Sequence, residues 1–291
     1  ANLFQLAKRL GAHEQCALCI LSDTPGIPDA ARTLQPLSVS LSLGPLKEEG
    51  ALALLHELAK VSGDHEAVGR QLAELVDVLA GHPLALCVLG SLLEDGDVEQ
   101  MMAALEEIMP GIHEGQAHLR NGAVILALEY LMRSFDQDTR YAIYGLGLFA
   151  GGFVDFLVPR LLDIEEEAWD RHRRKLGSTQ LLRTHRLAGI NVPFVRLHPA
   201  LSQHLARRLG SQQREQLEER HYGSYLGLLN WLTETEAEYA DAARMLARHE
   251  LPNFRKGFEY ILEAGNLNAA VTYMRHLQHF LNLLNLPAER D

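Results

Sequence analysis

The sequence has few of the features that define a secreted or membrane-spanning protein. Its 291 residues include three cysteines, an odd number that provides no disulfide framework and is typical of a reducing compartment. The longest apolar stretch, residues 78–93, is interrupted by Gly81-His82-Pro83 and is too short to span a bilayer. From its opening residues we also expect no signal peptide. We therefore expect a cytoplasmic protein with no membrane partner.

Positive charge is also scarce, since the net charge is −11 at pH 7. A general polyanion binder needs a clustered positive field, so the composition argues against a protein whose main role is to coat nucleic acid. β-Branched residues are sparse outside short runs, whereas Leu, Ala, Glu and Arg are abundant. This balance favours helix over sheet. Because apolar residues make up 47% of the chain, we expect a globular protein.

Motifs for metal binding and nucleophilic catalysis are missing as well. Cys16 and Cys19 form a C-x-x-C, but residues three apart on a strand point to opposite faces and cannot hold one ion. Structural zinc also needs four ligands, and no second pair follows. The sequence has no H-E-x-x-H and no G-x-S-x-G. We therefore expect no metal site and no catalytic residue.

The hydrophobic pattern predicts a mainly α protein. Short strands are expected at residues 16–21 and 37–43, and helical periodicity follows from 45 to 110 with a break at 81–83. Three helices (121–135, 137–147 with Asp136 as N-cap, and 165–177) precede two strands, an order typical of a winged helix-turn-helix. The remaining predicted elements are strands at 180–183 and 192–197 and helices at 200–209, 215–232, 237–248, 252–264 and 267–284.

Several short motifs occur in a characteristic order. The first strand runs into Ser22-Asp23-Thr24, and the second into Gly44-Pro45-Leu46. They are followed by GHPLAL at 81–86, LGLFAGGF at 146–153, RLHPAL at 196–201 and EAGNLNAA at 263–270. In this order the motifs resemble the STAND family of signalling NTPases of the NB-ARC type. The resemblance covers most of the chain.

The resemblance implies four domains. They are a remnant of the α/β nucleotide-binding domain (1–46), a helical ARC1-like subdomain (47–112), a winged helix (113–210) and an α-helical TPR-like module (211–291). In this family the G-x-P proline packs on the base and ribose, and the winged-helix histidine reaches the β-phosphate of ADP. Pro83 and His198 are therefore the implied nucleotide-contacting residues. Exchange of ADP for ATP would release the winged helix and allow oligomerisation.

The departures from the family are as informative. The sequence has no G-x-x-x-x-G-K-[ST], no strand with paired acidic residues for Mg²⁺, and no sensor arginine at Ser22-Asp23-Thr24. We therefore expect a piece of a longer protein that does not hydrolyse ATP and has no cofactor of its own. ADP and ATP would be the cofactors of the full-length protein.

The expected function is a regulatory and oligomerisation segment that couples ADP/ATP state to a C-terminal sensor, with protein partners or its own copies as ligands. One alternative is a winged-helix DNA-binding regulator, in which the basic run at 171–175 reads the major groove. That alternative predicts that Arg173 and Arg174 contribute to salt-dependent DNA affinity. A second alternative is a protein-interaction scaffold that never meets nucleotide.

Overall fold

Every helix and strand that the structure describes lies in the second of two units, Leu46–Asp291. The computed structural model describes residues 43–59, 65–93, 98–116, 122–187 and 189–284. The predicted strand at 16–21, its two cysteines and Ser22-Asp23-Thr24 lie outside these residues. So does the strand predicted at 37–43, apart from Leu43, which is in no helix or strand.

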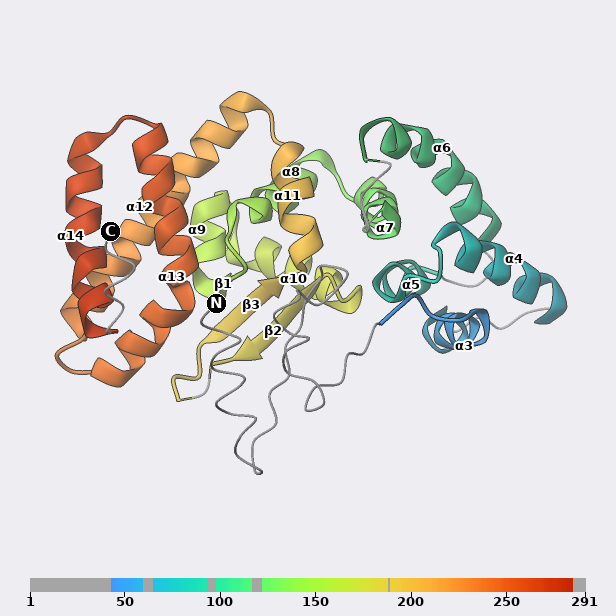
Figure 1. Ribbon diagram of the computed structural model, residues 1–291, viewed down its shortest axis with the longest axis horizontal. Coiled ribbons are helices and arrows are strands. Elements are labelled where there is room, and N and C mark those ends of the chain that lie inside the picture. The colour runs from blue at the N-terminus through green and yellow to red at the C-terminus, as the bar shows by residue number, and fades with distance from the viewer. Residues whose placement is uncertain (1–42, 60–64, 94–97, 117–121, 188, 285–291) are drawn as a thin grey trace, which may run out of the picture. The chain divides into compact units, whose positions relative to one another are not determined.

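The first part of this unit is helical, as the periodicity predicts. It contains α3 (Glu48–Ala59), α4 (His65–Val78), α5 (Pro83–Gly90), α6 (Val98–Gln116) and α7 (Gly122–Arg133) (Figure 1). Helix α5 is apolar on nearly all sides because neighbours surround it: it packs on α3 and on α7. Helix α7 also packs against α6. The break at Gly81-His82-Pro83 therefore separates two helices that share one core.

The middle part combines short helices with a small antiparallel sheet. Its elements are α8 (Gln137–Gly145), β1 (Gly152–Val154), α9 (Val158–Leu162), α10 (Glu166–Ser178), β2 (Leu182–Arg186), β3 (Pro193–Leu197) and α11 (Pro199–Arg207). The sheet order is β1-β3-β2. Arg196 of the central strand β3 lies opposite Gly152 of β1 on one side and opposite Arg183 of β2 on the other. Asp136 caps α8 as predicted, since its carboxylate accepts a hydrogen bond from the Thr139 amide at 2.8 Å.

Two elements of this part were missed from the sequence. Strand β1 has three residues and α9 has five, so neither is long enough to show a hydrophobic period. β1 exists because its backbone pairs with β3, which lies about forty residues further along the chain. The hairpin strands were predicted at 180–183 and 192–197. In the structure they are Leu182–Arg186 and Pro193–Leu197, so the first begins two residues later than predicted.

The last part is a group of three long helices lying side by side: α12 (Ser211–Thr235), α13 (Ala240–Glu263) and α14 (Leu267–Leu283) (Figure 1). The prediction of two helices, at 237–248 and 252–264, is wrong because α13 continues through Pro252. Proline removes one helical hydrogen bond, which commonly ends a helix. Here Glu250, Asn253 and Phe254 are fully buried around the proline, and their packing holds both halves in one helix.

One continuous hydrophobic core extends through the described elements from α3 to α14. Helix α7 lies after the predicted boundary at 112/113, yet it packs against α5 and α6 before that boundary and α11 after it. The four domains and their boundaries stay predictions. Within the described residues, no helix combines the length and apolarity needed to cross a bilayer.

Candidate functional site

The loop Gly81-His82-Pro83 is held in a defined shape between α4 and α5. Helix α4 ends in a left-handed turn, with φ of 48° at Ala80 and 62° at Gly81, and the Gly81 amide donates to the carbonyl of Val76 at 3.0 Å. The Leu46 amide donates to the Gly81 carbonyl at 2.9 Å. The structure therefore joins two motifs that the sequence separates by more than thirty residues, 44–46 and 81–83.

His82 and Pro83 start helix α5. Pro83 is exposed at the first helical position, where its fixed φ fits the helix and its missing N–H costs nothing. His82 precedes it in an extended conformation, as residues before proline prefer. The Nδ1 atom of His82 is buried and has no hydrogen-bond partner among the described residues. Burial lowers the pKa of His82, so the ring is neutral near pH 7.

His198 occupies the same kind of position at another helix. It lies between the end of β3 and α11, and Pro199 opens that helix. The His198 amide donates to the Leu181 carbonyl at 3.2 Å, and its carbonyl accepts from the Leu201 amide at 2.9 Å. The ring is half-buried. Both sequence-predicted regions are thus His-Pro pairs at a helix N-terminus, where backbone N–H groups favour a negative ligand.

In the folded protein, charged groups from other elements act on His198 and on helix α5. Burial lowers the pKa of His198, and the positive charges of His82 and Arg183 lower it further. Arg183 also acts on Cys87 of α5, whose pKa is raised by burial and lowered by the arginine. The charges of His82 and Arg183 therefore both act on His198, although the three residues lie before α5, in β2 and before α11.

Like charges gather on the same sheet face. Arg183 and Arg196 are exposed and directly opposite each other in the β2–β3 register. Two cations at opposed positions destabilise a sheet unless solvent or an anion screens them. Arg183 also acts on His198, which precedes the N-terminus of α11, so this end of the sheet favours a phosphate group, whereas Arg196 acts on His185 and His249. Sequence reasoning missed Arg183, because only the strand pairing places it beside His198.

A second cluster, fully buried, lies between β1 and α13. The Asn253 side chain accepts from the Ala150 amide and donates to the Gly152 carbonyl, both at 2.6 Å. Glu250 accepts from the Val154 amide at 2.5 Å and from the Tyr225 hydroxyl at 2.8 Å. Since 150–154 overlaps the predicted LGLFAGGF motif, α13 holds this motif through its backbone.

Glu250 is an unusual residue to find at 0% exposure. Burial raises the pKa of Glu250 to about 7, although hydrogen bonds from Asn253, Tyr225 and the Val154 amide oppose the rise. The sequence does contain a pattern that indicates the burial of Glu250 and Asn253. Both continue, at helical spacing, the buried stripe formed by Ala243, Leu246 and Ala247. It was missed because Pro252 was interpreted as the start of a new helix.

The basic run at 171–175, considered above for DNA binding, makes mainly internal contacts. Arg173 forms ion pairs with Asp155 at 3.1 Å and with Asp170 at 2.7 Å. Arg174 donates to the Asp170 carbonyl, and Lys175 donates to the Ser134 hydroxyl and lies over the ring of Phe135. These contacts orient α10 within the protein and leave less of its charge for a phosphate backbone.

No protein-family model and no curated protein sequence matches this chain. Within the described residues, no group of three or more His, Cys, Asp or Glu side chains could hold a metal ion. The observations that bear on function are therefore the fold, the His82–His198–Arg183 neighbourhood and the buried Glu250–Asn253 cluster.

Proposed function

We propose that this chain is the regulatory and oligomerisation segment of a STAND-type nucleotide switch and is not catalytic by itself. The observation that carries the proposal is that the two His-Pro pairs each precede a helix and that the charges of His82 and Arg183 both act on His198. A nucleotide held by the rest of the switch would place its base and ribose against Pro83 and its phosphates against His198. Phosphate oxygens would then accept hydrogen bonds from the imidazole and the guanidinium.

The element order supports the winged-helix part of this proposal. The three helices predicted for the winged helix correspond to α7, α8 and α10, which precede the β2–β3 hairpin as in winged helix-turn-helix domains. Helices α3 to α6 correspond in place to the ARC1-like subdomain. Helices α12 to α14 correspond to the TPR-like module that leads toward a sensor.

Hydrogen bonds and strand pairing provide a continuous route from the histidines to the C-terminal helices. His198 follows β3 directly, and β3 pairs with β1. The backbone of β1 is in turn bound by Glu250 and Asn253 of α13. A ligand that moves His198 would therefore shift β3 and, through it, β1, whose backbone is hydrogen-bonded to α13. Coupling of this kind needs two arrangements with different affinities for the ligand, which the intact switch would supply as its ADP and ATP states.

The proposal predicts weak, phosphate-dependent binding by this chain alone. Because the P-loop motif is absent, we expect a dissociation constant no tighter than about 1 mM for ADP, or about −4 kcal/mol. Titration with ADP, followed by NMR of the imidazole C–H groups, should raise the pKa values of His198 and His82, since a nearby anion favours protonation. AMP, which lacks the β-phosphate, should change them much less. His56, exposed on α3, is the internal control.

Two variants test the residues of this site. Arg183→Gln should weaken the ADP effect at least ~3-fold, because a charge-assisted contact to phosphate is lost. Arg186→Gln, on the same strand, should not. Equal responses to ADP and AMP, or no response up to about 20 mM, would contradict the proposed site. Micromolar ADP binding by calorimetry would show that the chain needs no P-loop.

A further inference from the structure

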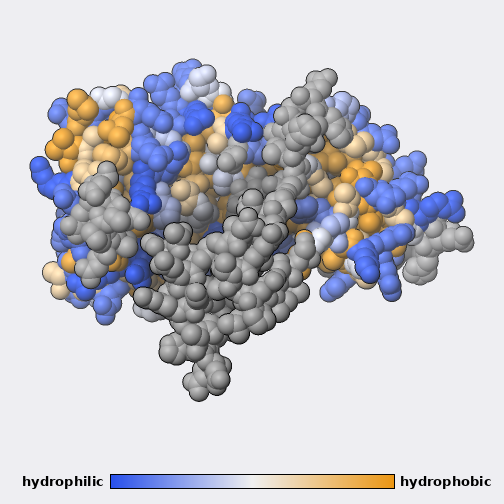
Figure 2. All heavy atoms as spheres, viewed as in Figure 1, coloured by the Kyte–Doolittle hydropathy of each residue, from blue (hydrophilic) through white to orange (hydrophobic). Residues whose placement is uncertain are grey.

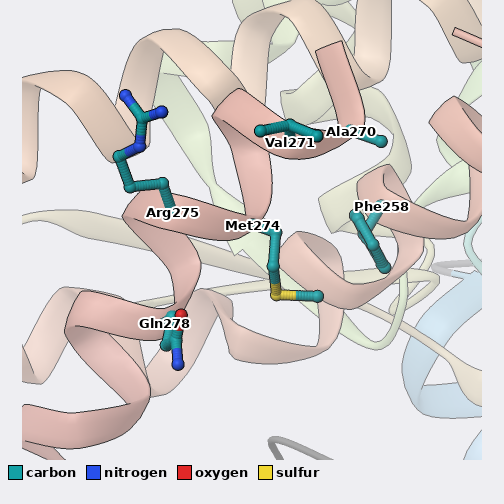
Figure 3. Close-up of a pocket in the computed structure, with 6 residues that line it drawn as sticks. All are labelled: Phe258, Ala270, Val271, Met274, Arg275 and Gln278. Atoms are coloured by element: carbon teal, nitrogen blue, oxygen red, sulfur yellow. The ribbon is translucent and has the colours of Figure 1, made fainter. Parts of the chain in front are cut away.

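The turn from α13 into α14 exposes apolar side chains but defines no ligand chemistry. Leu262 and Leu267 are 50% and 71% exposed, and in Figure 2 hydrophobic atoms reach the surface at the upper left, over these two helices. Beside them, a groove of about 440 Å³ is lined by Phe258, Ala270, Val271, Met274, Arg275 and Gln278 (Figure 3). Arg275 is the one charged side chain among these six. The chemistry of a ligand is defined more clearly on the sheet, where charges of one sign gather.

Two imidazoles flank the ring of Phe194 where the β2–β3 hairpin meets α13. The ring centroids of His185 in β2 and His249 in α13 each lie 5.4 Å from that of Phe194. Beside them the hairpin loop lies against the same helix, because a Cβ at Gly189 would come within 3.2 Å of the Met245 Cε atom. Both imidazoles are half-buried, and the described residues provide no hydrogen-bond partner for their nitrogens. These nitrogens are therefore available to a ligand.

Arg196 lies on the same face of the sheet as Phe194. The two residues are two positions apart in β3, and side chains alternate between the faces of a strand. Both side chains also fold over Gly152 of β1, where an added Cβ would meet the Phe194 ring and would come within 3.0 Å of the Arg196 Cγ atom. The lack of a side chain at Gly152 therefore lets the stem of Arg196 lie beside the ring.

The charges that act on the two histidines are positive. Burial lowers the pKa of both His185 and His249, and the charge of Arg196 lowers them further. Arg248 also acts on His249. Arg196 and Arg248 are exposed, and neither forms an ion pair within the described part of the chain. Glu250, the next residue of α13, is buried and accepts a hydrogen bond from the backbone of β1 instead. The cluster therefore has cations without a balancing acid.

We propose that His185, Arg196 and His249 form a binding site for a phosphate group, separate from the region around His198. His185 lies two residues beyond Arg183 along β2, which is about 7 Å. Donors from β2, β3 and α13 would approach the ligand from different sides, the guanidinium with its planar fork and each imidazole with one N–H. A tetrahedral dianion has oxygens directed toward all of them, whereas a carboxylate has two oxygens in one plane. The bound group would neutralise the like charges and fasten the hairpin to α13.

Titration with inorganic phosphate at pH 7 and constant ionic strength, followed by NMR of the imidazole C–H groups, tests this site. Phosphate should raise the pKa values of His185 and His249, because a bound anion favours the protonated rings, with half-saturation at roughly 1–10 mM. Acetate should act at least ~5-fold more weakly. Arg196→Gln should weaken phosphate binding at least ~5-fold, and Arg196→Lys, which keeps the charge without the fork, should weaken it less. Arg186→Gln, on the other face of the same hairpin, is the matched control and should bind like the wild type.

The occupant and the site are tested by separate comparisons. O-Phosphoserine that binds more tightly than inorganic phosphate would identify a phosphate ester as the occupant, and weaker binding would identify free phosphate. Either order supports the site. Unchanged pKa values at His185 and His249 up to about 50 mM phosphate overturn the proposal, and so does a phosphate response that Arg196→Gln leaves intact.

The site does not depend on the proposed nucleotide switch. The switch is tested by the difference between ADP and AMP at His198 and by Arg183→Gln, whereas this site is tested by phosphate at His185 and His249 and by Arg196→Gln. Either proposal can therefore fail while the other holds. Thermal unfolding of each variant checks that the hairpin remains folded.

Discussion

His221 of α12 lies at 0% exposure among three aromatic rings, with centroids 4.6 Å from Tyr225, 5.2 Å from Tyr260 and 5.6 Å from Phe149. Both of its ring nitrogens are buried without a hydrogen-bond partner in the described structure. Burial, aided by the charge of Lys256, lowers the pKa of His221 to about 3. At this site the imidazole acts as a neutral aromatic ring rather than as a titrating base.

The buried histidine makes stability sensitive to acid. The unfolded chain takes up a proton on His221 below about pH 6.5, whereas the folded chain resists protonation down to about pH 3. The free energy of unfolding should therefore fall by roughly 2 kcal/mol from this group as the pH drops from 7.5 to 5. His221→Phe should remove that loss while keeping stability at pH 7.5 unchanged or higher, because two unsatisfied nitrogens disappear.

Urea denaturation at pH 7.5 and pH 5 measures this effect. His56→Gln is the control, since His56 is exposed on α3 and its replacement should leave the pH response intact. If His221→Phe loses as much stability in acid as the wild type does, then the burial of the ring is not the source of the acid sensitivity.

At the scale of the elements, the backbone after α8 approaches α11 so closely that only glycine fits at position 147. Gly147 follows α8 within the LGLFAGGF motif and lies against α11. A Cβ there would come within 2.4 Å of the Ala206 amide nitrogen and 2.7 Å of the Ser202 carbonyl oxygen. Since those atoms are backbone, the helix itself would have to move. This requirement explains physically why the motif has glycine at 147.

Gly147→Ala should thus destabilise the protein by more than about 2 kcal/mol through overpacking at α11. Gly223→Ala is the opposite case, because a Cβ at that position of α12 meets nothing within 4 Å. It should stabilise the protein by up to about 1 kcal/mol, as alanine is the better helix former. Thermal unfolding of both variants measures the contrast. Similar melting temperatures for the two would show that α11 is not packed on Gly147 as described.

At the scale of the whole molecule, the buried Glu250–Asn253 cluster links the sheet to the three C-terminal helices. The donor and acceptor of Asn253 are fixed by the Ala150 amide and the Gly152 carbonyl, so its amide can only donate to Glu250. A glutamine at 250 would turn one acceptor oxygen into a donor and leave a buried clash of two donors. The link therefore depends on the carboxyl group itself.

Glu250→Gln should lower the melting temperature at pH 8, where the wild-type carboxylate is ionised and accepts all three hydrogen bonds, and should separate the unfolding of α12–α14 from that of the rest. The wild type should also lose roughly 1 kcal/mol between pH 6 and pH 8 from Glu250, because its folded pKa, about 7, lies above the unfolded value. That stability is fully present in acid and is lost as the pH rises through 7. Calorimetry of both proteins at pH 6 and pH 8 measures the two effects.

Gln278→Glu, on the exposed face of α14, is the matched control for a Gln/Glu change without burial. A single unchanged transition in Glu250→Gln would mean that apolar packing alone couples the two parts. Because His221 acts in the opposite direction over this range, the test uses the His221→Phe background, in which a stability that does not fall between pH 6 and pH 8 would contradict the raised pKa of the Glu250 carboxyl group.

The sequence by itself determined the features that local interactions control. Hydrophobic periodicity predicted the helical regions from α3 to α14 other than the short α9, the Asp136 cap follows from one side chain, and proline after His82 and His198 marks two helix starts. Each of these depends on residues within a few positions of one another. The assignments to nucleotide binding stay predictions, since they depend on a resemblance rather than on a contact.

Tertiary structure decided the rest, because it depends on contacts between distant segments. Strand β1 exists through pairing with β3, and α13 passes Pro252 because buried side chains on both sides hold it. The proximity of His82, His198 and Arg183 comes from three different elements. A buried polar residue such as Glu250 is intelligible only when its partners are known. Local propensity depends on residues that are neighbours in the sequence, whereas these sites depend on residues that become neighbours only in the folded structure.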